Sequence, residues 1–310
     1  MPAPPTIGVF DSGFGGLTVL RALLPLLPHA RFLYLGDTAR LPYGSKSRET
    51  IARYAVSSAR FLLDGGADLL VIACNTATAL ALEDIRIAAA PIPVLGVIEP
   101  GAQAGLAAPP TLALAPPNRA APSPSGPLIP TPSAPPEILV LATPATVQSR
   151  AYTHALLRLG LPAIEKACPL LVPLVEEGWI DHPVTREVVR IYLAEAHAGQ
   201  PRLHTLLLGC THYPLLRPIF EQTLASLNRP LRLIDSAQAT AHTVATHLQA
   251  LTSSLQDPNT PHRPAPPRTD QPTPPPCTFY ATDSVEKFAQ LGSHFLGQPL
   301  PHVHLIDLGG

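Results

Sequence analysis

Two cysteines of this chain stand in similar sequences and could share one chemical task. Cys74 lies in LLVIACNTAT (69–78) and Cys210 lies in TLLLGCTHYP (205–214), so each follows an apolar run and precedes polar residues. A thiolate accepts a proton and a thiol donates one, and a free cysteine titrates near ~8.5, close enough to neutrality for both forms to occur. Two cysteines on opposite walls of a cleft could therefore take a proton from one face of a carbon atom and return one to the other face.

The apolar run before each cysteine indicates a β-strand, and the residues after it indicate a helix. Such a cysteine lies in the positive end of the helix dipole, among backbone N–H groups that favour the thiolate. For either cysteine taken alone, an ordinary buried core residue stays an open alternative. Cys168 precedes a proline and Cys277 follows three, so neither has these surroundings and we assign them no chemical role.

The elements that must hold these residues predict an α/β protein. Seven short apolar runs alternate with longer segments of helical period, which is typical of parallel sheets covered by helices on both faces. In such sheets the ligand crevice lies outside the carboxyl ends of the strands. We expect the small or polar residues at six strand ends to line one site: Asp11 with Ser12, Gly36 with Asp37, Cys74 with Asn75 and Thr76, Glu99, Thr143, and Cys210 with Thr211 and His212.

The similarity of the two cysteine segments indicates a weak internal repeat. Cys74 and Cys210 are 136 positions apart, which is enough for each to lie in its own domain. We predict two similar parallel-sheet α/β domains related by pseudo-twofold symmetry, with the active site in the cleft between them. Residues 1–98 with 235–310 would form the first domain, and residues 99–234 the second.

Half of the 40 prolines of the chain are clustered in two segments. Segment 107–136 carries eleven and segment 255–276 carries nine, and neither has apolar periodicity. Both are typical of disordered or polyproline-like surface insertions, and nothing charged or aromatic frames them as docking sites. We expect deletion of residues 109–134 behind a short Gly/Ser linker to keep activity, because loop entropy changes slowly with length.

Length and charge narrow the classes of function. The 310 residues, 46% of them hydrophobic, can fill one large or two ordinary domains. A formal net charge of −1 gives no field that attracts polyanions, so nucleic acid is not expected as a partner. Four scattered cysteines form neither a disulfide framework nor a C-x-x-C metal pair. Without a membrane-length apolar stretch or a signal peptide, the chain is expected to be cytoplasmic, with no membrane partner.

Eight longer sequence blocks extend along the chain. They are IGVFDSGFGGLTVL (7–20), YLGDTARLPYGSKS (34–47), VIACNTATA (71–79), VLGVIEPG (94–101), LATPATVQSRAY (141–152), CPLLVPLVEEG (168–178), LLLGCTHYPLL (206–216) and LIDSAQATA (233–241). In these blocks the chain resembles the bacterial glutamate racemases of the cofactor-independent aspartate/glutamate racemase superfamily. Eight blocks in the family's order are far more specific than any one block, and the resemblance covers the whole chain except the two proline-rich segments and the extreme ends.

This resemblance implies racemisation of glutamate without pyridoxal phosphate, metal or other cofactor, as a supply of D-glutamate for peptidoglycan. The catalytic cysteines of the family fall on Cys74 and Cys210, with Cys74 deprotonating D-glutamate and Cys210 deprotonating L-glutamate. Asp11 and His212 would be their respective helpers in handling protons. A homodimer is compatible with the resemblance, but its geometry varies within the family and cannot be derived from this chain.

The resemblance also implies the substrate contacts, which are Ser12, Pro42, Tyr43, Gly44, Asn75, Thr76, Thr143 and Thr211. Hydroxyls and backbone N–H groups at helix N-termini suit the carboxylates of glutamate without a fixed positive charge that would hold both cysteines as thiolates. Each hydroxyl taken alone could instead be a helix cap. Asp37 and Glu176 match acidic positions near the site, although Asp37 could cap a turn and only the resemblance selects Glu176 over Glu177.

Other activities fit the residues less well. The turn DSGFGGLT with Asp37 loosely imitates a dinucleotide fingerprint, but Thr18 stands where its third glycine belongs. None of the three lysines, Lys46, Lys166 and Lys287, ends an apolar strand in the way that would suggest a pyridoxal Schiff base. Two alternatives stay open: a racemase for another amino acid such as aspartate, and a non-catalytic amino-acid-binding protein of the same fold.

Overall fold

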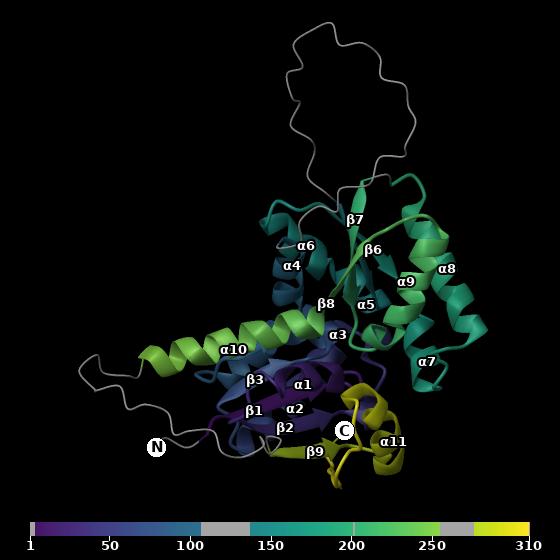
Figure 1. The fold of residues 1–310 in the computed structure, drawn as a ribbon. Coiled ribbons are helices and arrows are strands. Elements are labelled where there is room, and N and C mark those ends of the chain that lie inside the picture. Colours follow the sequence, from purple (N-terminus) through teal and green to yellow (C-terminus); the bar gives the residue numbers. More distant parts are fainter. Residues whose placement is uncertain (1–3, 107–136, 201, 255–275, 310) are drawn as a thin grey trace, which may run out of the picture.

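The computed structural model describes residues 4–106, 137–200, 202–254 and 276–309 of the chain. Within these residues the strands form two parallel sheets, which Figure 1 shows one above the other. The proline-rich segment 107–136 and all of segment 255–276 except Pro276 lie outside the described residues. The expectations for these two segments therefore stay predictions.

The first sheet has six parallel strands. They are β1 Thr6–Asp11, β2 Arg31–Gly36, β3 Leu69–Ile72, β4 Val94–Gly96, β9 Cys277–Ala281 and β10 Val303–Leu305, in the spatial order β10-β9-β2-β1-β3-β4. Strands β1 and β2 pair in register until Asp11 lies opposite Gly36, and Phe10 of β1 lies opposite Ile72 of β3. The residues that follow these three strands therefore meet at one edge of the sheet.

The second sheet has four parallel strands. They are β5 Glu137–Ala142, β6 Ala163–Ala167, β7 Leu203–Gly209 and β8 Arg232–Asp235, in the spatial order β6-β5-β7-β8. Ala142 lies opposite both Ala167 and Gly209, so the next residue of each strand stands at one edge.

Both sheets repeat one arrangement of strands. The spatial order β2-β1-β3-β4 in the first sheet matches the order β6-β5-β7-β8 in the second. In each set the strand that comes first along the chain, β1 or β5, has a neighbour on both sides. A cysteine follows the strand that comes third along the chain, β3 or β7. A shared strand order is what a pseudo-twofold relation between two units requires. The predicted fold class, two similar parallel-sheet α/β units, is confirmed.

Helices and short 3-10 turns connect the strands. The helices are α1 Leu17–Leu23, α2 Arg48–Asp64, α3 Asn75–Ala89, α4 Ile98–Leu106, α5 Pro144–Ser149, α6 Ala151–Arg158, α7 Leu171–Glu176, α8 Pro183–His197, α9 Arg217–Ser226, α10 Ser236–Ser254 and α11 Val285–Leu296. The 3-10 turns are η1 Thr38–Arg40, η2 Tyr43–Ser45 and η3 Tyr213–Leu216.

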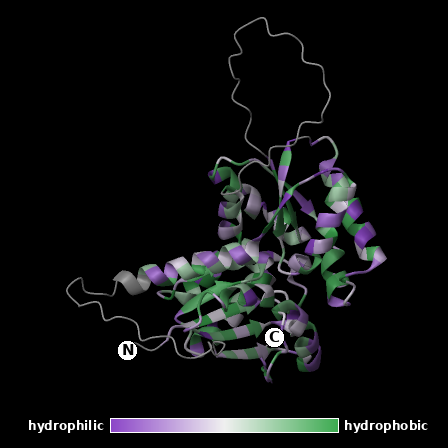
Figure 2. Cartoon of the chain, in the orientation of Figure 1, coloured by the Kyte–Doolittle hydropathy of each residue, from purple (hydrophilic) through white to green (hydrophobic). Residues whose placement is uncertain are grey.

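Alternating side chains bury both faces of each sheet. In β1, Ile7 and Val9 join the core shared with α1 and α11, whereas Phe10 joins the core under α2 and α3. The second sheet packs α4 and α6 on one face and α8 with α9 on the other. Figure 2 shows the strands of both sheets as predominantly hydrophobic elements. This burial on both faces explains why most strands appear in the sequence as continuous apolar runs.

Helix α10 links the two sheets. It follows β8 of the second sheet and packs against α1 of the first, and Ala237 and Ala241 join a core that contains strand residues of both sheets. We propose the chain division 1–98 with 235–310 and 99–234 for the two units. Asp235 then stands at the boundary, because it is the last residue of β8 in the second sheet.

Candidate active site

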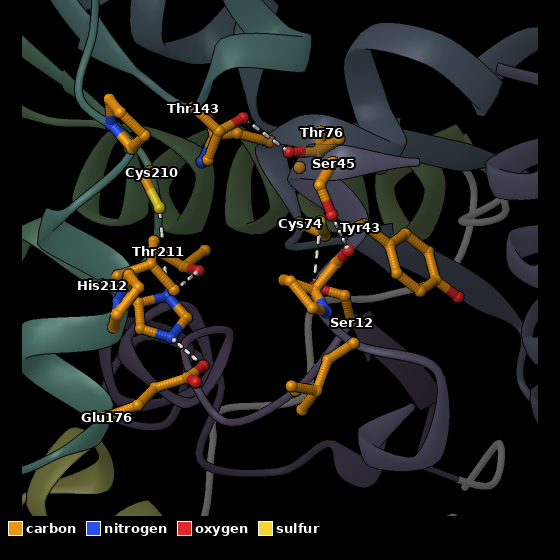
Figure 3. Close-up of a pocket in the computed structure, with 18 of the residues that line it drawn as sticks. Ser12, Tyr43, Ser45, Cys74, Thr76, Thr143, Glu176, Cys210, Thr211 and His212 are labelled. Carbon is orange, nitrogen blue, oxygen red and sulfur yellow. Dashed lines mark hydrogen bonds and ion pairs between the residues drawn. The ribbon is translucent and has the colours of Figure 1, made fainter. Parts of the chain in front are cut away.

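A cavity of about 260 Å³ opens between the carboxyl ends of the two sheets (Figure 3). Of the fourteen residues that the resemblance implies for the site, twelve line this cavity and two, Asp11 and Asp37, do not; Gly36, expected from its strand end, does not line it either. Glu99 was also expected at the site from its strand end, and that expectation is wrong. It lies in α4 beyond the edge strand β4, where its exposed carboxylate pairs with Arg86 and Arg158.

Cys74 forms one wall of the cavity together with uncharged partners. It is the N-cap of α3, where its Sγ accepts a hydrogen bond from the Ala77 N–H at 3.4 Å and donates one to Ser12 Oγ at 3.4 Å. Burial raises the pKa of the Cys74 thiol to about 12, and the Asp11 charge adds to this shift. The hydrogen bonds that Cys74 makes with the Ser12 hydroxyl and the Ala77 N–H lower this pKa, but their effect is weaker than that of burial. The helix N-terminus is therefore present as predicted, but burial outweighs it and favours the thiol.

Asp11 lies behind this wall. It is 1% exposed, and its Oδ2 accepts a hydrogen bond from the Gly13 N–H at 2.9 Å, while its Oδ1 has no hydrogen-bond partner among the described residues. Burial raises the pKa of Asp11, although the nearby His212 opposes the shift. The Asp11 carboxyl group does not line the cavity, but its charge affects the groups there and its hydrogen bond holds the turn at Gly13.

Cys210 forms the opposite wall and has an ionisable partner. Its Sγ lies 3.9 Å from His212 Nδ1, and His212 Nε2 lies 3.0 Å from Glu176 Oε1. Burial alone would lower the pKa of His212, but its contacts with Cys210 and Glu176 raise it to about 10. The imidazolium form can donate one N–H toward the Cys210 sulfur and the other to the Glu176 carboxylate.

The element after Cys210 differs from the one after Cys74. An α-helix was expected there, but the chain forms the short 3-10 turn η3, and α9 begins only at Arg217. Close packing of Thr211 and His212 against the backbone of Gly15 holds this segment in place instead. A Cβ built on Gly15 would stand 2.3 Å from Thr211 Oγ1 and 2.6 Å from His212 Nδ1, so only glycine fits beside them.

Hydroxyl groups from both sheets meet at one end of the cavity. Thr143, which caps α5, lies 3.0 Å from Thr76 through their Oγ1 atoms, and Thr146 Oγ1 lies within 3.3 Å of both. Thr76 lies in the first turn of α3, which follows β3 of the first sheet, whereas Thr143 follows β5 of the second. These hydroxyls offer neutral hydrogen-bond donors to an anionic ligand.

A loop around η2 forms a further wall. Tyr43 is 1% exposed, and its hydroxyl donates a hydrogen bond to Asp37 at 2.5 Å. Asp37 also accepts hydrogen bonds from Arg40 at 2.7 Å and from Thr282 at 3.0 Å. Asp37 therefore lies behind the cavity and anchors Tyr43, and its side chain does not cap η1. A Cβ on Gly44 would stand 3.2 Å from Thr143, so this loop reaches the opposite sheet.

Sequence comparisons identify relatives along the full length of the chain. No family model matches it. It is 47% identical over 315 residues to the glutamate racemase of Koribacter versatilis, which covers 99% of this chain and 98% of the relative. The chain belongs to the glutamate racemases. The resemblance inferred from the eight motifs is thus confirmed, and the protein is an isomerase of the amino-acid racemase type.

Solved glutamate racemases share the fold. The enzyme of Francisella tularensis in complex with D-glutamate matches with a TM-score of 0.77 at 30% identity, over 99% of each chain. The enzyme of Thermus thermophilus in complex with β-chloro-D-alanine matches with a TM-score of 0.74 at 37% identity, over 99% of this chain and 98% of that one.

Sequence reasoning missed several residues of this racemase cavity. Cys168, Val172 and Pro173 line it beside Glu176. Cys168 directly follows β6, but this strand is only half-buried and contains Glu165 and Lys166, so no apolar run marks it. Its pairing with β5 could have been inferred only by extending the internal repeat, in which β6 corresponds to β2.

Within the described ranges of the chain, no group of three His, Cys, Asp or Glu side chains could hold a metal ion. No helix in the same ranges is both long and apolar enough to cross a membrane.

Proposed function

We propose that this chain interconverts L- and D-glutamate by two proton transfers, with Cys74 and Cys210 as the acid–base groups. The observation that carries the proposal is that both thiols, each 5% exposed, line one cavity from the ends of corresponding strands of the two sheets. A racemase must remove the α-hydrogen from one face and add a proton on the other. Two acid–base groups on opposite walls meet that requirement.

The electrostatics suit one direction of this reaction in the resting site. The raised pKa keeps Cys74 as a thiol, while the raised pKa of His212 places a cation close to the Cys210 sulfur. Cys210 would take the α-proton of L-glutamate, breaking the C–H bond and leaving its electron pair on the α-carbon. Cys74 would then protonate the opposite face and become the thiolate. That second state is the one that accepts D-glutamate.

Substrate binding would rely on neutral groups. Among the described residues that line the cavity, none is Lys or Arg. The carboxylates of glutamate would be bound by the hydroxyls of Ser12, Thr76, Thr143 and Thr211 and by the Asn75 amide. The substrate ammonium brings a positive charge close to the thiols, which lowers the cost of forming a thiolate at Cys74. A permanent cation beside Cys74 would remove this control.

The absence of a lysine from the lining also favours chemistry without pyridoxal phosphate, because that cofactor needs a lysine for its Schiff base. We further propose that the D-glutamate formed supplies peptidoglycan synthesis in the cytoplasm. A homodimer is compatible with this role.

The decisive experiment is incubation of the purified protein with L-glutamate alone in deuterated water. We expect D-glutamate to form and the α-position to exchange for deuterium, with no effect of a carbonyl reagent that traps pyridoxal phosphate. L-aspartate is the matched substrate control and should exchange far more slowly. Binding of glutamate without exchange would overturn the proposal in favour of a binding protein, and faster exchange of aspartate would reassign the substrate.

A further inference from the structure

The side chain of Asn75 faces two environments. Its Oδ1 accepts a hydrogen bond of 2.6 Å from the Tyr152 hydroxyl, whereas its Nδ2 has no hydrogen-bond partner among the described residues. Asn75 is 2% exposed and lines the cavity, so the unpaired N–H groups are withdrawn from bulk water beside the ligand space. Buried donors without a partner are costly, and a ligand that accepts hydrogen bonds can satisfy them.

Tyr152 is held firmly in the position from which it makes this contact. It lies in α6, is fully buried, and its ring packs between two glycines. A Cβ on Gly209 would stand 2.9 Å from the ring, and one on Gly101 would stand 3.4 Å from the ring and its hydroxyl. Burial raises the pKa of Tyr152, so the hydroxyl stays protonated and remains a donor.

We propose that Tyr152 is a positioning residue that fixes the orientation of the Asn75 amide across the two units. With its oxygen bound to the tyrosine hydroxyl, the amide turns both N–H groups toward the cavity, where they bind a carboxylate of the amino-acid substrate. The opposite orientation would lose the hydrogen bond and aim the amide oxygen at an anionic ligand. This inference rests on the proposed function.

The first test is Tyr152→Phe, which removes only the hydroxyl. A contact made equally in the bound substrate and the transition state changes KM and leaves kcat unchanged. We expect KM for both glutamate enantiomers to rise about fivefold to tenfold, the size of one buried hydrogen bond, with kcat within about twofold. Tyr213→Phe is the matched control, because Tyr213 is also fully buried and its hydroxyl donates to the Cys168 carbonyl at 3.1 Å. Its KM should stay within about twofold of the wild type.

The second test is a double-mutant cycle. If Tyr152 acts through Asn75, then adding Tyr152→Phe to Asn75→Ala should raise KM no further. A full additional rise in the double variant would overturn the inference, since Tyr152 would then act by another route. A wild-type KM in Tyr152→Phe would overturn it as well.

A third variant keeps the tyrosine and so does not depend on how well Tyr152→Phe folds. Asn75→Asp still offers Tyr152 an acceptor oxygen, but it turns an anionic oxygen toward the cavity. It should therefore raise KM more than Asn75→Ala does, and a smaller rise would contradict the stated orientation. The two failures give different results. If the proposed function is wrong, the wild type does not racemise glutamate; if only this inference is wrong, the wild type racemises glutamate and the KM values of the variants differ from those expected.

Discussion

The two walls of the cavity share a backbone plan but differ in their chemistry. Cys74 and Cys210 both follow the third strand of a four-strand set with the same spatial order. The first thiol contacts a serine hydroxyl and a backbone N–H, whereas the second faces the pair formed by His212 and Glu176. The internal repeat therefore explains the similar backbone positions of the two sulfur atoms, and the neighbouring side chains give the two sulfur atoms different surroundings.

The different surroundings of the two thiols matter for a reaction that interconverts two enantiomers. A site with two thiols or two thiolates at rest could not both remove and supply a proton. Burial keeps the proton on Cys74, while the raised pKa of His212 supplies a cation beside Cys210. In the proposed two-cysteine reaction, these unequal walls would offer an acid at Cys74 and a base at Cys210 before the substrate arrives.

The largest expected effect comes from removing either thiol. Cys74→Ala and Cys210→Ala should each lower racemisation by several powers of ten, because each variant lacks one of two required proton-transfer groups. Circular dichroism of glutamate at a fixed enzyme concentration measures the rate. Cys277→Ser is the control and should retain activity, since Cys277 lies in β9 and does not line the cavity. Full activity in either alanine variant would disprove the two-base reaction.

Conservative Cys→Ser variants distinguish the two faces. The equilibrium constant between enantiomers is one, so kcat/KM stays equal in both directions and cannot reveal an asymmetry. Elimination of chloride from β-chloroalanine needs only one base and can reveal it. Cys74→Ser should impair elimination from the D-analogue more than from the L-analogue, and Cys210→Ser should do the reverse. Release of pyruvate from each enantiomer is the measurement.

Two further outcomes of the elimination assay are informative. An inverted bias would keep two bases but exchange the faces assigned to Cys74 and Cys210. Equal losses with both analogues in both variants would mean that neither cysteine is specific for a face.

Replacing His212 or Glu176, which lie beside Cys210, should reduce the rate of elimination less than removing a cysteine reduces racemisation. His212→Asn removes the cation beside Cys210 and should slow elimination from the L-analogue about a hundredfold. Glu176→Gln keeps the imidazole but removes the carboxylate that raises the pKa of His212, so its loss should be smaller and on the same face. Glu177→Gln is the matched control, because this neighbouring carboxylate also lines the cavity. If His212→Asn slowed elimination from the D-analogue more than from the L-analogue, His212 would not act through Cys210.

The smallest expected effect is on the way the thermal stability of the protein depends on pH. The pKa of His212 is about 10 in the folded chain and near ~6.5 in an unfolded one, so folding favours the protonated ring. This contribution is complete below ~6.5, declines as the pH rises, and is lost above about 10. The difference in Tm between the wild type and His212→Asn should therefore shrink from pH 6 to pH 10. A difference that grows with pH would contradict the raised pKa.

Strand ends were the most predictable part of the site. Strands β1, β3 and β5 are buried at every residue, so each gives an unbroken apolar run whose end is easy to locate. Ser12, Cys74 and Thr143 were found in this way. Strands β6 and β10 are partly exposed and carry charged or polar residues, so no such run marks them.

Contacts between distant segments could not be derived from local pattern. Glu176 and Glu177 are equivalent in sequence, and only the packing of α7 brings Glu176 to His212. Asp37 follows a buried strand as predicted, but its partner Tyr43 turns it into an anchor behind the wall. The pKa of Cys74 was inferred in the wrong direction, because burial depends on the whole fold and the helix dipole only on local sequence.

The place of β9 in the first sheet has a consequence for the order of assembly during synthesis. The ribosome delivers every strand of the second sheet, residues 137–235, before it makes β9, which pairs with β2. Two of the six strands of the first sheet, β9 and β10, are therefore made after the whole second sheet, so the first sheet is completed last although its synthesis begins first. Until Cys277–Ala281 emerges, β2 presents an open edge, and Asp37 lacks its bond from Thr282. A nascent chain stalled before this point would hold a finished Cys210 wall beside an edge prone to aggregation.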